Sequence, residues 1–164
     1  AHRFQPMLSD ATRGYYNYVA EHDGGRYGEL VKRFLADPND RESADKLEAN
    51  DPGYTRTRCV ATMLTAGHAP NAMAQRAEAT VNCRIFPGVS VDHIRQELQA
   101  LAGPDVDVTV IEESRTPETA ATPLREDIVE AYRSAVGGRF KGTTIIPRQS
   151  AGATDGAFLR AVCP

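Results

Sequence analysis

The spacing of apolar residues changes along the chain, from a helical period in residues 1–54 to a strand period after them. In the first stretch, a segment running to Pro38 places its apolar side chains on one face, which predicts an amphipathic helix. An earlier segment, with Asp10 as its predicted N-cap, ends at Gly24, and the charged residues 41–49 predict a surface helix. Residues 1–54 are therefore predicted to form a helical, polar stretch.

The clearest element is a strand over residues 77–85, in which every second residue is apolar. One face of this strand is expected to build a core, and the other stays free for chemistry. A β-branched run over residues 55–65 predicts a second strand, joined to the first by a polar turn at residues 66–71. The core-facing set is Ala77, Ala79, Val81, Cys83 and Ile85, and the polar set is Arg76, Glu78, Thr80, Asn82 and Arg84.

A helix is predicted after these strands. Ser90 is a suitable N-cap, Asp92 favours the positive end of the helix dipole, and Gly103 ends the apolar stripe. Alternating valines at residues 106–110 then predict another strand. This order of elements predicts an α+β fold for residues 55–115, with helices packed on one face of an antiparallel sheet.

The last part, residues 116–164, follows a polar linker. Thr122 and Pro123 form a cap and first-turn pair for a helix that ends near Gly137, and a short β-rich run occupies residues 143–146. A loop and a terminal helix follow, which is typical of an α/β segment belonging to a second domain. The chain begins without methionine and stops just after a helix-like segment, so we expect it to be a piece of a longer polypeptide.

Charge and hydropathy narrow the possible partners. The formal net charge is -3, with 19 Lys and Arg against 22 Asp and Glu scattered along the chain, so no basic face for nucleic acid is expected. No apolar run approaches the roughly 20 residues that span a bilayer. We therefore expect neither nucleic acid nor a membrane as a partner. The protein is expected to be soluble, and the cytoplasm is the favoured compartment.

Neither cysteines nor histidines show the spacing of a metal site. The cysteines, odd in number and without a Cys-x-x-Cys pair, are interpreted as buried small apolar residues rather than disulfide partners or zinc ligands. Glu112 and Glu113 resemble the base-and-ligand pair of co-catalytic zinc hydrolases, but a solvated strand end is the favoured interpretation. Ser150 does not lie in the Gly-x-Ser-x-Gly pattern of a nucleophile elbow, so the sequence does not favour serine-based catalysis. The cysteines are Cys59, Cys83 and Cys163, and the histidines are His2, His22, His68 and His93.

Two groups of residues could bind a ligand. The loop from Gly152 to Gly156 joins a predicted strand to a helix start, where free N–H groups favour a carboxylate or phosphate, although a simple turn capped by Asp155 fits equally well. Asn71 lies in the turn before the long strand, and Arg84 lies on the polar face of that strand. Arginine can hold a carboxylate with two hydrogen bonds, and an asparagine amide can donate to a carbonyl oxygen. From spacing alone, the interpretation of Arg84 as an exposed arginine on a half-solvated sheet is favoured over a ligand-binding role.

The run from Asn71 to Gly88 resembles the lid, or dimerisation, domain of metallopeptidase family twenty. That family includes aminoacylases, glutamate carboxypeptidases and succinyl-diaminopimelate desuccinylases. The shared pattern is a glycine-bearing turn, an asparagine, an alternating strand ending in arginine and Pro-Gly, and an amphipathic helix; Met73-Ala74 replaces the usual apolar residue and proline. The run from Ser150 to Gly156 is similar to the Gly-Gly-Thr-Asp loop through which the family's chain re-enters its catalytic domain.

The resemblance covers residues 55–164 and implies a ferredoxin-like lid at residues 55–115. Residues 1–54 would then be a helical insertion or arm of the lid, and residues 116–164 a partial return segment of the catalytic domain. The implied site has Asn71 on the substrate carbonyl, in many members across a dimer interface, and Arg84 on the substrate carboxylate. Gly152 and Thr154 would line the substrate pocket.

The reaction implied by the resemblance is hydrolysis of an amide bond in a small peptide or N-acyl amino acid. Water would be activated between two zinc ions, with a glutamate as general base. The zinc ligands and catalytic residues are expected outside this chain, which alone would bind no zinc and be inactive, and a homodimer through the lid is expected. Ala157 replaces a second arginine of some members, which argues against a dicarboxylate substrate. The alternative is a non-catalytic α+β module that binds a small ligand or pairs through sheet edges.

Overall fold

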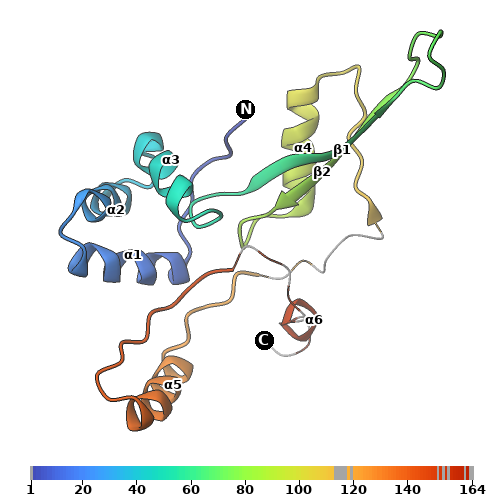
Figure 1. Ribbon diagram of the computed structural model, residues 1–164. Helices are drawn as coiled ribbons and strands as arrows, with labels where there is room; N and C mark the ends of the chain where they lie inside the picture. Colours follow the sequence, from blue (N-terminus) through green and yellow to red (C-terminus); the bar gives the residue numbers. More distant parts are fainter. Residues whose placement is uncertain are drawn as a thin grey trace.

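A computed structural model describes residues 2–112, 118, 120–150, 152, 154, 156–160 and 162. It has an α+β fold, which confirms the predicted class. A cluster of three helices leads into a long β-hairpin with a helix beside it, and two further helices follow along the chain (Figure 1). The elements are α1 (Asp10–His22), α2 (Arg26–Ala36), α3 (Arg41–Asn50), β1 (Arg58–Ala66), β2 (Ala77–Arg84), α4 (Val91–Ala102), α5 (Glu126–Arg139) and α6 (Gly156–Arg160).

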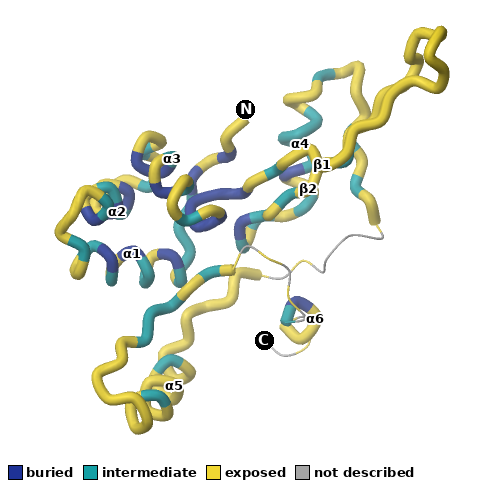
Figure 2. Tube along the Cα trace, viewed as in Figure 1, coloured by how far each residue is buried: buried dark blue, intermediate teal, exposed yellow. Residues whose placement is uncertain are grey.

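The helical prediction for residues 1–54 is confirmed, and the main hydrophobic core lies there. Apolar faces of α1, α2 and α3 meet around Tyr16 and Phe34, whose ring centroids lie 5.8 Å apart in an edge-to-face arrangement. Figure 2 shows the buried positions concentrated in this cluster. The fully packed set is Tyr16, Val19, Val31, Phe34, Ala44, Leu47 and Tyr54.

Side-chain caps fix where α1 and α3 begin. Ser9, rather than the predicted Asp10, is the N-cap of α1, and it forms a reciprocal capping box with Thr12. Asp40 caps α3 by accepting hydrogen bonds from the backbone N–H groups of Glu42 and Ser43. Asp10 instead lies in the first turn of α1, where its charge favours the helix dipole.

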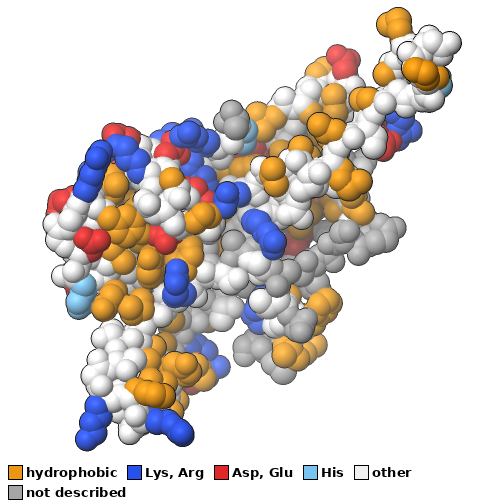
Figure 3. Space-filling view, in the orientation of Figure 1, with side chains coloured by type: hydrophobic (Ala, Val, Ile, Leu, Met, Phe, Trp, Pro, Cys, Tyr) orange, Lys and Arg blue, Asp and Glu red, His pale blue; other side chains and the backbone are white. Residues whose placement is uncertain are grey.

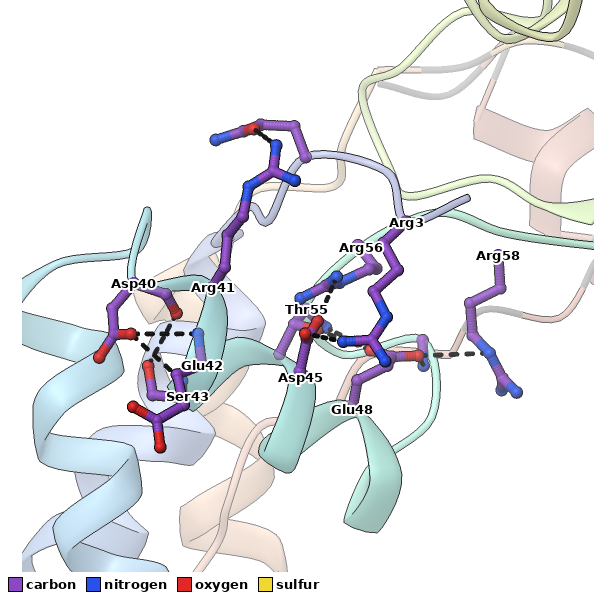
Figure 4. A network of polar contacts seen from close by, with 12 residues as sticks. Arg3, Asp40, Arg41, Glu42, Ser43, Asp45, Glu48, Thr55, Arg56 and Arg58 are labelled. Atoms are coloured by element: carbon purple, nitrogen blue, oxygen red, sulfur yellow. Dashed lines mark hydrogen bonds and ion pairs between the residues drawn. The ribbon is translucent and has the colours of Figure 1, made fainter. Parts of the chain in front are cut away.

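A polar network attaches α3 to the segment that enters β1 (Figure 4). Arg56, almost completely buried, places Nη1 2.7 Å from Oδ1 of Asp45, and Arg3 pairs with the same carboxylate. Glu48 accepts from both the backbone N–H and the hydroxyl of Thr55, at 3.2 and 2.7 Å. Burial lowers the pKa of Arg56, and the neighbouring carboxylates offset the free-energy cost of burying its positive charge. This network sets the direction in which the hairpin leaves the helices.

The two predicted strands form an antiparallel hairpin, with Arg58 opposite Arg84 and Ala66 opposite Ala77. The register shifts between Ala61 and Met63, which is the position of a β-bulge. At the base, Phe86 is buried and its N–H donates to Oγ1 of Thr57 at 2.9 Å.

The interpretation of the cysteines as unpaired apolar residues is wrong for two of them. Cys59 and Cys83 face each other in the hairpin register and form a disulfide, with Cα atoms 4.1 Å apart. Directly opposed residues in an antiparallel ladder come close enough for such a bond. Cys163 lies outside the described residues.

The apolar face of the hairpin does not build the predicted core. Leu64 and Val81 are 76% and 43% exposed, and only Cys59, Cys83 and Ile85 of the apolar set reach intermediate burial. Apolar side chains therefore remain visible along the hairpin (Figure 3). The reason is that no second layer of the described residues covers that face along its length.

The helix after the hairpin is confirmed as α4, with Ser90 as N-cap and Gly103 as C-cap at φ +87°. Two strand predictions are wrong: residues 106–110 and 143–146 have no strand partner in the described part of the chain. Alternation alone cannot supply the ladder that a strand needs. The predicted helix after Thr122 begins later, at Glu126 in α5.

No helix in the described part of the chain has the length and hydropathy needed to cross a bilayer.

Candidate functional site

Arg84 ends β2 at the base of the hairpin and is exposed. Its strand partner is Arg58, whose guanidinium Nε lies 3.4 Å from Oε1 of Glu48. Within the described residues, no carboxylate or hydrogen-bond acceptor engages the guanidinium of Arg84. An exposed arginine fork without an internal partner is available to a ligand carboxylate.

The structure brings Gly152 to Arg84, although 68 positions of chain separate the two residues. A methyl group placed on Gly152 would lie 3.7 Å from Nη1 of Arg84 and 3.5 Å from Oγ of Ser150. The N–H of Gly152 donates to that same serine hydroxyl at 3.2 Å. The structure therefore places the glycine loop beside the arginine that ends β2.

Thr154 lies on the same loop, two residues before the start of α6. Its carbonyl accepts a hydrogen bond from the N–H of Ala157 at 3.0 Å, and its hydroxyl lies beside Gly156. The side chain of Ala157, in the first turn of α6, is buried. The alternative interpretation of the loop as a turn capped by Asp155 falls on a residue outside the described ones.

Asn71 is not brought to Arg84 within one chain. It lies in the turn at the tip of the hairpin and is exposed, whereas Arg84 lies at the base. The strand alone covers about 23 Å from Ala77 to Arg84, at roughly 3.3 Å per residue. A small substrate held by Arg84 cannot also reach the Asn71 amide of the same chain.

The histidines are dispersed. Nε2 of His2 lies 2.7 Å from Oε1 of Glu97, Nε2 of His93 lies 3.8 Å from Oε2 of Glu97, and His68 is exposed at the hairpin tip. Among the residues the structure describes, no three His, Cys, Asp or Glu side chains are grouped to hold a metal ion. Glu112 is exposed, and Glu113 lies outside the described part.

Sequence reasoning missed the contacts that hold the loop. Arg148 and Gln149, just before Ser150, bind to the helical cluster through Tyr54 and Gly53. No spacing pattern marks these residues, because their partners lie more than ninety positions away in the sequence. The disulfide could have been predicted from the sequence, since Cys59 and Cys83 lie at nearly equal distances from the hairpin turn and therefore oppose each other.

The family model of the peptidase dimerisation domain matches residues 28–110, a range that runs from α2 through the hairpin and α4. No curated protein and no solved structure matches the chain.

Proposed function

The chain belongs to the peptidase dimerisation domain family, and from this membership we propose that it serves a zinc-dependent metallopeptidase or amidohydrolase. That enzyme hydrolyses a peptide or N-acyl-amino-acid amide bond, and this part supplies substrate binding and dimerisation. In this proposal residues 55–115 are the lid, residues 1–54 are its helical arm, and residues 116–164 return toward the catalytic domain.

The observation that supports the proposal best is the meeting of Arg84 with Gly152. The guanidinium of Arg84 has no partner among the described residues and faces a backbone that carries no side chain at Gly152. A bidentate arginine contact holds the free carboxylate of a peptide or acyl amino acid in one orientation. The scissile amide bond is then kept at a fixed distance from the lid.

The hairpin supports a second role for the lid in a homodimer. Asn71 projects from the tip, too far from Arg84 to share a substrate within one chain. In a two-fold dimer it would reach the site of the partner subunit, where its amide would donate to the substrate carbonyl. Gly152 and Thr154 would line the pocket around the carboxylate held by Arg84.

The described residues of this chain do not fit a metal centre, since none of their potential ligands are grouped. In the proposed enzyme, two zinc ions would be bound by other parts of the polypeptide and would activate the attacking water. The contribution of this chain is to bind and orient the substrate.

The test is Arg84→Ala in the full-length protein, assayed against a set of short peptides and N-acyl amino acids. Loss of a bidentate carboxylate contact costs about 2 kcal/mol, so kcat/KM is expected to fall roughly thirtyfold. Arg133→Ala is the matched control, because Arg133 is an exposed arginine of α5 that pairs with Glu130. An effect of Arg84→Ala within about twofold would contradict the proposed role. Absence of hydrolysis by the native protein would favour a binding module instead.

A further inference from the structure

The segment before Gly152 lies against the helical cluster. Nε of Arg148 donates to the hydroxyl of Tyr54 at 2.7 Å, and its guanidinium carbon lies 5.3 Å and 5.5 Å from the ring centroids of Tyr15 and Tyr54. These distances are within the range of cation–π contacts. One side chain thus combines a hydrogen bond with two aromatic contacts to residues of the helical cluster.

The residues on either side of Arg148 add contacts to the same surface. Nε2 of Gln149 donates to the carbonyl of Gly53 at 3.2 Å, and its Oε1 accepts from Oγ of Ser9 at 2.6 Å. Pro147 packs so closely on α1 that a methyl group on Gly14 would lie 2.6 Å from its Cγ. Three consecutive residues therefore attach this segment to the helices.

The attachment lies close to the candidate site along the chain. Arg148 precedes Gly152 by four residues, a span of at most about 14 Å of extended chain. Ser150, between them, accepts the hydrogen bond from the N–H of Gly152. The position of Gly152 beside Arg84 is consequently limited by where Arg148 is held.

We propose that Arg148 is a positioning residue for the substrate site: its contacts with Tyr15 and Tyr54 hold Gly152 beside Arg84. This inference rests on the proposed function, and it assigns the helical cluster a role in substrate binding. Because Arg148 does not touch the substrate, its loss changes how the pocket is shaped around the carboxylate. The chemical step, which takes place elsewhere, is left largely unchanged.

The first experiment compares Arg148→Ala, Arg148→Lys and the control Arg139→Ala in the full-length protein. Arg139 is an exposed arginine at the end of α5. We expect Arg148→Ala to raise KM about tenfold with kcat changed less than twofold, the split that marks lost ground-state binding. Lysine keeps the charge but lacks the planar fork, so Arg148→Lys should recover only part of the loss. Equal falls in kcat and kcat/KM, or an unchanged KM, would overturn the proposal.

Tyr54→Phe tests the same contact from the other side, and it keeps the proposal testable if Arg148→Ala does not fold. It removes only the hydroxyl that accepts from Arg148. The same rise in KM, at smaller magnitude, is expected, and the double variant should be no worse than Arg148→Ala alone. Fully additive effects would contradict a shared mechanism.

Amide hydrogen exchange separates failure of this inference from failure of the proposed function. Arg148→Ala should speed exchange at residues 150–160 at least fivefold, whereas Arg139→Ala should not. Faster exchange in a protein without hydrolase activity would support the attachment of the loop by Arg148 and overturn the proposed function. Unchanged exchange in an active enzyme whose Arg84→Ala variant is impaired would overturn only the positioning role.

Discussion

The hydroxyl of Tyr16 is an unfavourable group in the helical core. The side chain is fully buried, yet its oxygen has no hydrogen-bond partner among the described residues. Its ring contributes the packing instead, with centroids 5.8 Å from Phe34 and 6.3 Å from Tyr54. Burying an unsatisfied hydroxyl opposes folding, whereas burying the ring favours it.

Tyr16→Phe is therefore expected to stabilise the protein by about 1 kcal/mol, because it removes the unsatisfied hydroxyl and keeps the ring. Urea unfolding midpoints measure the effect. Tyr54→Phe is the matched control, and it should destabilise, since its hydroxyl accepts from Arg148. A loss of stability in Tyr16→Phe would mean that the hydroxyl has a partner after all.

Alkaline pH is expected to weaken the same core. Burial raises the pKa of Tyr15, Tyr16 and Tyr27 above 10.0, and the hydroxyl of Tyr27 also bonds to the Asp51 carboxylate. Above pH 10 the unfolded chain loses protons that the folded chain keeps, so stability is complete below that pH and falls as the pH rises past it.

Unfolding midpoints measured between about pH 9 and about pH 11 test this expectation. The native protein should lose stability steeply over that window, and Tyr27→Phe should lose less of it. Equal slopes for the two proteins would show that the ionisation of Tyr27 is not linked to folding.

At the scale of elements, local chemistry accounts for the helices better than for the strands. Ser90 and Gly103 delimit α4 as expected, because a capping hydroxyl and a glycine at positive φ act on backbone groups a few residues away. The valines at residues 106–110 alternate with polar residues as a strand would require, and yet they do not form a strand. A strand needs a partner from elsewhere in the chain, which local sequence cannot guarantee.

Ser90→Ala should destabilise the protein by about 1 kcal/mol, because the serine hydroxyl accepts from the N–H of His93 at the start of α4. Ser90→Asp should restore most of the loss. Thermal or urea unfolding of both variants measures the effect, and equal stability of Ser90→Ala and the native protein would contradict it.

The disulfide is expected to contribute about 3 kcal/mol, because it closes a loop with a sequence separation of 24. The double variant Cys59→Ala, Cys83→Ala should unfold at lower urea concentration by that amount, and reduction of the native protein should have the same effect. Peptide mapping without reductant should recover Cys59 linked to Cys83. Two freely alkylated cysteines in the native protein would refute the bond.

At the scale of the whole molecule, the hairpin extends away from the cluster of α1, α2 and α3 with an uncovered apolar face (Figures 1 and 3). Leu64 is 76% exposed on it, and Val81 is 43% exposed. Exposed apolar surface of this kind marks an interaction site. Membership in the dimerisation family identifies the expected partner as a second copy of this chain.

Leu64→Lys should weaken self-association at least tenfold without lowering the stability of the subunit, because the leucine is exposed before assembly. Sedimentation equilibrium of the full-length protein measures the change. Ile128→Lys on α5, 57% exposed, is the matched control and should leave association unchanged. Equal association of the two variants would place the interface away from this face of the hairpin.

The sequence by itself determined the helices of residues 1–54, the hairpin, the boundaries of α4 and the α+β class. Each of these depends on periodicity, capping or turn residues that act over a few positions. The same local pattern identified Arg84 as a possible carboxylate ligand, but it could not show whether a ligand would reach that residue.

Only the tertiary structure decided which distant residues meet. It placed Gly152 beside Arg84 and attached Arg148 to Tyr54. It also left the apolar face of the hairpin uncovered. These outcomes depend on contacts between segments far apart in sequence, whose formation is fixed by the packing of the whole chain rather than by any local pattern.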